Sequence, residues 1–183
     1  PDIFYYNIPG YSGKFYYNQT DQKFHTLPID KVDIIYTFAT GIFTINTPDG
    51  NKFIFDQKEF TTTTQSCDGN LSGAANMVPT AWYLSSMKNA NETEEISFTY
   101  NAGYYAFEGL NSETRYFLTA AFGEPYGSPP DYNISNCSQS STMDVKRLSR
   151  ITFRGGYLEF TTQSTDRCDV PGDRALSKIE LFT

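Results

Sequence analysis

Groups that can shuttle protons or bind metals are scarce in this sequence. Its 183 residues include one histidine, three cysteines and one tryptophan, and charged residues make up only 19% of the chain. A Ser-His-Asp triad or a Cys-His pair would have to use His25, and no Gly-x-Ser-x-Gly element accompanies it. The scattered cysteines also lack the CxxC spacing that zinc sites often show. We therefore predict a protein that is not an enzyme and has neither a metal nor a cofactor.

Basic residues and long apolar runs are also few. The chain has 14 Lys and Arg against 21 Asp and Glu, which gives a net charge of −7. An acidic chain repels phosphate backbones, so nucleic acid is not an expected partner. No apolar run approaches the roughly 20 residues that a membrane-spanning helix needs. Since the chain starts at Pro1 with no Met or signal-like segment, we expect a processed or trimmed fragment of a longer protein.

Carboxylates leave two chemical alternatives to weigh. A glycosidase needs two carboxyl groups about 5 Å or about 6.5–9.5 Å apart, and the sequence singles out no such pair among its 21 acids. The acidic segment 166–169 with Asp173 offers oxygen ligands for calcium but lacks the alternating spacing of a calcium loop. We therefore interpret this segment as a structural turn and rank a glycosidase behind non-catalytic functions.

Aromatic residues are abundant, with 14 Tyr and 15 Phe. Because neighbouring residues of a strand point to opposite faces, one ring of each adjacent Tyr pair must face outward. Stacking of such rings on sugars makes a glycan a possible partner. The candidate ligand-binding residues are Tyr104, Tyr105, Tyr126 and Tyr132. Trp82 lies in an apolar run and is interpreted as a core anchor instead.

Alternation of apolar and polar residues with a period of two predicts β-strands along most of the chain. Two β-rich runs flank residues 48–51, where Pro48 presets one turn residue and Gly50 accepts a positive φ. Two more runs flank Gly155-Gly156, and a third pair is joined by a polar segment. The sequence therefore predicts three hairpins, over residues 41–56, 82–100 and 147–162.

The rest of the chain predicts further strands and two long loops. The strands are expected at residues 14–17, 23–27, 32–36, 104–107, 115–120 and 176–182. Residues 61–79 and 123–142 are too long for hairpin connections and are predicted to be insertions or binding loops. Only residues 72–78 and 140–147 are candidates for a short helix. The expected fold is a single all-β domain over residues 1–183, an antiparallel β-sandwich or curved sheet.

Three cysteines leave two interpretations open. They lie in polar, turn-rich stretches at Cys67, Cys137 and Cys168. An odd number leaves at least one without an intrachain partner. A Cys67–Cys137 disulfide and three free thiols are both compatible with the sequence.

Several sequence blocks, in this order, resemble a known family. They are Pro1-Asp-Ile-Phe4, Gly10-Tyr-Ser-Gly-Lys-Phe15, Phe43-Thr-Ile-Asn-Thr-Pro-Asp-Gly50, Thr80-Ala-Trp-Tyr-Leu84 with Ile96-Ser-Phe-Thr-Tyr100, and Pro171-Gly-Asp-Arg174 with Leu176-Ser-Lys-Ile-Glu-Leu181. Together they are similar to the region upstream of the YD repeats in RHS-repeat-like surface proteins of Bacteroidetes. The resemblance runs nearly end to end and implies a large exported protein whose β-hairpins form a shell, with no catalytic residues carried over.

Two functional hypotheses follow from the sequence. The first is a non-catalytic structural β module of a cell-surface or secreted protein, with the remainder of its own longer chain or another surface protein as its partner. The alternative is a carbohydrate-binding module that uses exposed tyrosines. The first hypothesis predicts that the strand at 176–182 leaves one edge unpaired.

Overall fold

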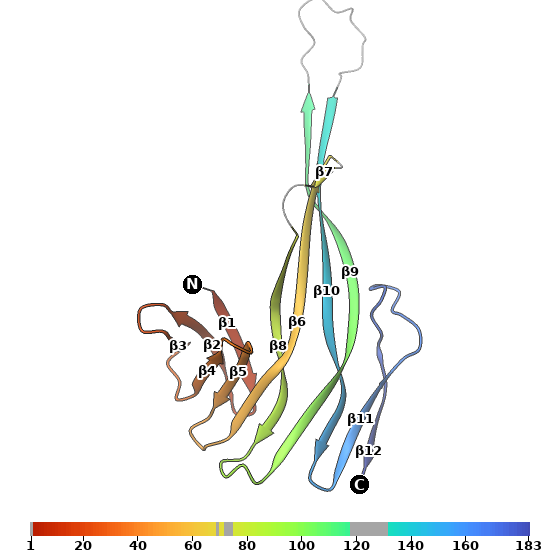
Figure 1. Ribbon diagram of the computed structural model, residues 1–183. Coiled ribbons are helices and arrows are strands. Elements are labelled where there is room, and N and C mark those ends of the chain that lie inside the picture. The colour runs from red at the N-terminus through yellow and green to blue at the C-terminus, as the bar shows by residue number, and fades with distance from the viewer. Residues whose placement is uncertain (1, 69, 72–74, 118–131) are drawn as a thin grey trace, which may run out of the picture.

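The protein is built from β-strands, as its computed structural model shows (Figure 1). The structure describes residues 2–68, 70–71, 75–117 and 132–183, and within them it contains no helix. A small sheet has the strand order β1-β2-β3, and a large sheet has the order β12-β11-β10-β9-β8-β6-β5-β4, with β7 paired to β6. All pairings are antiparallel, so the predicted all-β fold is confirmed.

The strands of the two sheets differ greatly in length. The small sheet consists of β1 (Ile3–Ile8), β2 (Tyr11–Asn18) and β3 (Lys23–Leu27). The large sheet consists of β4 (Asp33–Thr37), β5 (Ile42–Asn46), β6 (Lys52–Cys67), β7 (Asn70–Leu71), β8 (Asn76–Lys88), β9 (Glu95–Phe117), β10 (Tyr132–Phe153), β11 (Gly156–Thr162) and β12 (Leu176–Phe182). Figure 1 shows β6, β8, β9 and β10 running together into a narrow stem.

The three predicted hairpins are confirmed. They are the pairs β5–β6, β8–β9 and β10–β11. In the first, Gly50 has a φ of 86° and its N–H donates to the carbonyl of Thr47, as a tight turn after a proline requires.

Four strands of the large sheet form a closed circuit of pairing. The lower part of β6 pairs with β5, whereas its upper part, Phe60–Cys67, pairs with Cys137–Asp144 of β10. On its other edge β6 pairs with β8, and β8 pairs with β9 only through Ser86–Lys88. Because β9 pairs with β10, the circuit β6-β8-β9-β10 returns to β6. The sheet is therefore folded back on itself at the stem.

The prediction of a long loop at residues 61–79 is wrong. Residues 61–67 complete β6, and residues 76–79 begin β8, opposite them. The run of threonines at 61–64 is β-branched and suits a strand even though it is polar. Pro79 is accommodated beside a register shift between Glu59 and Phe60, where a bulge interrupts the ladder.

The prediction of a second loop, at residues 123–142, and both predictions of a short helix are also wrong over the described residues, almost all of which form strands. Residues 132–142 belong to β10, which pairs with β9 on one edge and with β6 on the other. Residues 140–147 are likewise strand, as are 76–78 of the other helix candidate. Residues 123–131 and 72–74 lie outside the described residues. Polar Ser and Asn residues form a strand here because neighbours on both sides satisfy their backbone groups.

A disulfide closes the stem. Cys67 and Cys137 are directly opposite each other in the β6–β10 register, with their Cα atoms 4.1 Å apart, and they are bonded. Beside the bond, the Asp68 carboxylate accepts hydrogen bonds from the Ser135 hydroxyl and the Asn136 N–H. Cys168 is an exposed free thiol. The paired alternative is thus the one that the structure shows.

The hydrophobic core lies under the small sheet. Eight buried residues form one cluster: Tyr6, Ile8, Phe15, Val32, Ile34, Phe43, Ile45 and Phe53. Tyr6, Ile8 and Phe15 come from β1 and β2, Val32 precedes β4, and the other four come from β4, β5 and β6. The two sheets therefore pack face to face, as in a sandwich, but only over the N-terminal strands of the large sheet.

Candidate functional site

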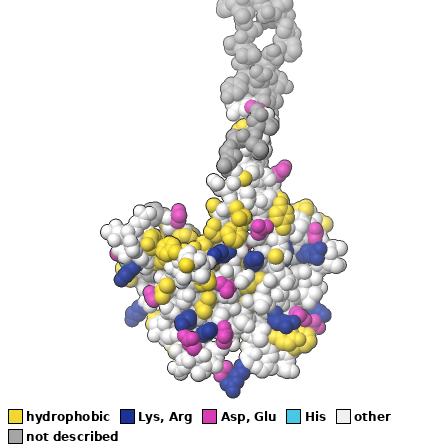
Figure 2. Space-filling model, viewed as in Figure 1, with side chains coloured by type: hydrophobic (Ala, Val, Ile, Leu, Met, Phe, Trp, Pro, Cys, Tyr) yellow, Lys and Arg dark blue, Asp and Glu magenta, His cyan; other side chains and the backbone are white. Residues whose placement is uncertain are grey.

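An aromatic pocket opens between the two sheets. It has a volume of about 680 Å³. The residues that line it are Asp2, Phe4, Tyr16, Tyr17, Asn18, Gln19, Thr20, Phe24, Tyr36, Phe38, Phe43, Pro79 and Trp82. Figure 2 shows hydrophobic side chains gathered where the small sheet meets the long strands, below the stem. We call this site the aromatic pocket.

Trp82 forms one wall of the aromatic pocket and is held rigidly. Its ring meets Phe43 edge-on, with centroids 5.0 Å apart, and Phe4 at 6.1 Å. Its indole N–H donates to the carbonyl of Gly41 at 3.0 Å. The predicted role as a core anchor is consistent with this packing, and the same ring also lines the pocket. A half-buried aromatic with its polar atom satisfied is a preorganised binding surface.

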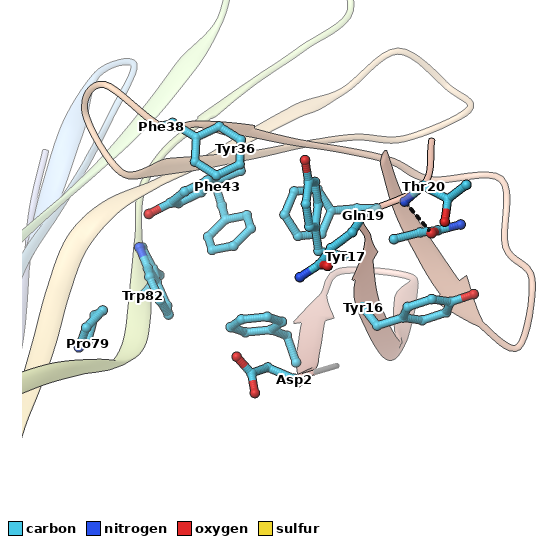
Figure 3. Close-up of a pocket in the computed structure, with 13 residues that line it drawn as sticks. Asp2, Tyr16, Tyr17, Gln19, Thr20, Tyr36, Phe38, Phe43, Pro79 and Trp82 are labelled. Carbon is cyan, nitrogen blue, oxygen red and sulfur yellow. Dashed lines mark hydrogen bonds between the residues drawn. The ribbon is translucent and has the colours of Figure 1, made fainter. Parts of the chain in front are cut away.

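Phe38 and a group of polar side chains form the rim. Phe38 lies between β4 and β5 and is 71% exposed, although its ring still contacts Tyr36 at 5.0 Å and Tyr17 at 6.0 Å. Figure 3 places Phe38 and Asp2 on opposite sides of the opening. Asn18, Gln19 and Thr20 also line the site, and the Thr20 N–H donates to the side-chain oxygen of Asn18. Apolar walls with a polar rim are typical of small-molecule sites.

Of the four tyrosines predicted as ligand-binding residues, Tyr104 and Tyr105 do not line the aromatic pocket. Tyr104 and Tyr105 are neighbours on β9, where Tyr104 is 56% exposed and Tyr105 is half-buried. The Tyr104 carbonyl lies against Gly172, whose φ of 88° and missing side chain allow this approach. Tyr126 lies outside the described residues, and for Tyr132 the structure describes the backbone, which begins β10.

Tyr83 of β8 and Tyr100 of β9 lie next to each other, with ring centroids 5.6 Å apart. The Tyr100 hydroxyl donates to the Leu84 carbonyl at 2.6 Å, and the Tyr83 hydroxyl donates to Glu59 at 2.9 Å. Burial and the Glu59 carboxylate raise the pKa of Tyr83 to about 12, and burial with the charge of Asp56 raises the pKa of Tyr100 to about 12. Both hydroxyls therefore stay protonated near neutral pH and act as structural donors.

His25 lies on β3 in a surface contact. Its Nε2 is 2.7 Å from the Asp21 carboxylate, and its ring lies 5.8 Å from Tyr16. The same aspartate accepts the N–H of Lys23, which is usual for a carboxylate in a turn. Both side chains are more than 40% exposed, at 42% and 41%. The pair thus links β3 to the turn that precedes it, on the surface of the small sheet.

The acidic segment after β11 is neutralised by arginines. Arg174 binds Asp166 at 3.1 Å, Arg167 binds Asp169 at 2.5 Å, and Arg147 of β10 binds Asp173 at 2.5 Å. Within the part of the chain that the structure describes, no three His, Cys, Asp or Glu residues gather as a metal site would need. These contacts agree with the structural-turn interpretation, because each carboxylate faces a guanidinium.

The apolar face of the large sheet continues beyond the core. Directly paired residues share a face, so the register Ile45–Phe53–Met87–Ile96 carries the core face from β5 to β9. The register Phe98–Ile151–Leu158–Leu181 carries it on to β12. We call the part on β9 to β12 the open face; its members are Ile96, Phe98, Ile151, Leu158, Phe160, Ile179 and Leu181, and none is buried.

Comparison with known proteins yields no relative. No family model, no curated protein and no solved structure matches this chain. Among the described residues there is also no helix with the length and apolarity needed to cross a bilayer. The function is therefore inferred from the aromatic pocket and the open face.

Proposed function

We propose that this protein is a non-catalytic structural module of a larger exported surface protein. The observation that carries the proposal is the open face. Ile45 and Phe53 are each 3% exposed under the small sheet, whereas Leu181, on the same face, is 61% exposed. Contiguous apolar surface of this kind marks an interaction site. A sheet with half of its apolar face covered is suited to receive a further β layer or further strands.

Two other features support this proposal. The Cys67–Cys137 disulfide is typical of proteins that fold in an oxidising compartment outside the cytoplasm. The long antiparallel strands also fit the sheet wall that the resemblance to RHS-repeat-like proteins implies. In this proposal the partner is the rest of the same polypeptide, and the module forms part of its shell.

An antibody raised against this chain tests the proposal in the cells that produce it. We expect a blot to show a polypeptide much heavier than 20.7 kDa, degraded when intact cells are treated with a protease. A cytoplasmic protein, blotted in parallel, should survive the same treatment. A protease-resistant band at 20.7 kDa would contradict the proposal.

The aromatic pocket favours carbohydrate binding as a second function. Sugar rings present apolar C–H faces that stack on aromatic rings and hydroxyls that bond to carboxylates and amides. The pocket offers the exposed ring of Phe38 together with Asp2 and Gln19 at the opening. The ligand would thus be a neutral glycan bound at these residues instead of at Tyr104 and Tyr105.

Trp82 provides a direct measurement of this binding. It is the only tryptophan in the sequence, and it lines the pocket, so its fluorescence reports occupancy. Titration with laminarihexaose, xylohexaose, chitohexaose and mannohexaose should change the emission with at least one of them. Phe38→Ala should raise the dissociation constant about tenfold, equivalent to about 1.4 kcal/mol. Tyr104→Ala, the matched control on an exposed ring outside the pocket, should leave it unchanged.

Two results would count against a glycan site. One is unchanged Trp82 emission with all four oligosaccharides. The other is a change in emission that Tyr104→Ala abolishes and Phe38→Ala does not, since this would return the site to the tyrosines predicted from the sequence.

A further inference from the structure

The last strand of the large sheet has an unprotected outer edge. β12 pairs with β11 and is terminal in the strand order, so no other strand among the described residues pairs with the backbone groups of its outer edge. Leu176, Ile179 and Leu181 are 53%, 52% and 61% exposed. Figure 1 shows this strand on the opposite side of the molecule from the small sheet. Such an edge is a template for pairing with another chain.

The charges on β12 do not protect this edge. Natural edge strands often carry lysines whose charge prevents pairing. Here the ammonium group of Lys178 is 2.8 Å from the carboxylate of Glu180 on the same strand, so the charge is balanced. Both side chains remain partly exposed, at 55% and 40%, and are accessible to a second strand.

The sequence of β12 is complementary to itself when it is reversed. If two copies pair antiparallel about a two-fold axis at Ile179, Lys178 of each copy lies opposite Glu180 of the other. The two Ile179 side chains then meet at the axis, on the open face. Opposite charges and apolar groups that face each other directly stabilise a strand pair.

We propose that a second copy of this chain pairs with the free edge of β12, in this antiparallel register. The two-fold axis is perpendicular to the sheet, so the two large sheets join into one and their open faces lie on the same side. The inference rests on the proposed structural function, because it names the element that extends the sheet in the isolated chain.

Sedimentation equilibrium of the full chain tests the pairing. The measurement uses a Cys168→Ser background, because the exposed Cys168 could otherwise link two copies by a disulfide. We expect a concentration-dependent species of twice 20.7 kDa. Lys178→Glu and Glu180→Lys should each weaken the dimer by about tenfold or more, since each places like charges opposite each other at two symmetric positions.

The double variant Lys178→Glu/Glu180→Lys is the decisive control. It should restore the dimer, because the exchanged charges again face each other across the axis. Circular dichroism should show that all three variants keep the β fold. The proposal is overturned by a wild-type chain that stays monomeric, by single variants that leave the dimer intact, or by a double variant that fails to restore it.

A dimer formed by stacking of two open faces gives a different result. Phe160→Ser would dissociate such a dimer, and the charge reversals at Lys178 and Glu180 would leave it unchanged. This combination of results would also overturn edge pairing. Failure of the edge pairing leaves the antibody experiment on the native polypeptide unaffected, so the two proposals fail separately.

Discussion

The two halves of the large sheet carry the same apolar pattern but differ in what covers it. On β4 to β6 the apolar face meets the small sheet, and Phe43, Ile45 and Phe53 are buried. On β9 to β12 the pattern continues in register, yet Phe98 and Leu158 are only half-buried and Ile179 is exposed. The comparison shows that strand patterning specifies a face for burial without supplying the layer that buries it. The covered half is a packed core, and the open half is the interface that we propose.

The sharpest test of this comparison replaces one phenylalanine in each half. Phe53→Ala should lower the free energy of unfolding by about 4 kcal/mol, because it leaves a cavity in a packed core. Phe98→Ala, on the open face, should lower it by about 1 kcal/mol, since solvent fills the space. Urea denaturation of both variants measures the difference. Equal losses would show that the open face is packed in solution.

The disulfide joins β6 of the covered half to β10 of the open half, and its removal should have the next largest effect. It closes a loop of 70 residues, so Cys67→Ser/Cys137→Ser should lower the free energy of unfolding by about 3 kcal/mol. Thermal denaturation with and without a reductant provides the measurement. Cys168→Ser is the matched control and should leave the melting temperature unchanged. A double variant as stable as the wild type would mean that the strand pairing alone holds the stem.

In the open half, an ion pair should contribute measurably to stability. Arg147 and Asp173 are only 19% and 20% exposed and fasten the segment after β11 to β10. Arg147→Ala should lower the free energy of unfolding by about 2 kcal/mol and speed proteolysis within residues 163–175. Arg154→Ala, at an ion pair where the arginine is 84% exposed, should change neither. Unchanged proteolysis in Arg147→Ala would contradict this anchoring role.

The smallest expected effect is on the pH dependence of the stability that the Arg147–Asp173 ion pair contributes. Burial is the largest single influence on the Asp173 carboxyl and alone would raise its pKa. Hydrogen bonds from Arg147 and from the Arg174 N–H, together with the charges of the nearby arginines, outweigh burial and lower this pKa below its ordinary value of 3.8. The stabilisation is therefore fully present above the unfolded-state pKa and is lost as the pH falls through the folded-state value. The stability difference between the wild type and Asp173→Asn should shrink below about pH 4. A difference that stays constant from pH 6 to about pH 2.5 would contradict the lowered pKa.

Short-range patterns predicted the strands more reliably than the loops. The three hairpins follow from alternation and turn residues, which act within a few positions of each other. Residues 61–67 and 132–142 were expected to be loops because their segments are too long for hairpin connections, yet residues 61–67 pair with residues 137–143, which lie 70 to 82 positions later in the chain. Polar composition did not prevent strand formation here, and the polar residues Thr61 and Ser141 are even buried, at 9% and 3% exposure.

The aromatic pocket was harder to predict than the fold. Adjacent tyrosines indicated candidates on β9, but a pocket requires rings from several elements that meet in space. Phe38, Tyr17 and Trp82 come from the β4–β5 turn, β2 and β8, and no spacing in the sequence connects them. An exposed Phe at a turn was the one available signal, because a large apolar ring at a turn is unusual without a partner.

The sequence by itself determined the antiparallel strands, the hairpin turns and the scarcity of groups suited to catalysis, because alternation and turn chemistry act locally. Tertiary structure decided which cysteines meet, where the aromatic pocket forms and how far the small sheet covers the large one. These features depend on contacts between residues distant in the chain, where the geometry of the folded sheets, and not local preference, sets which side chains are neighbours.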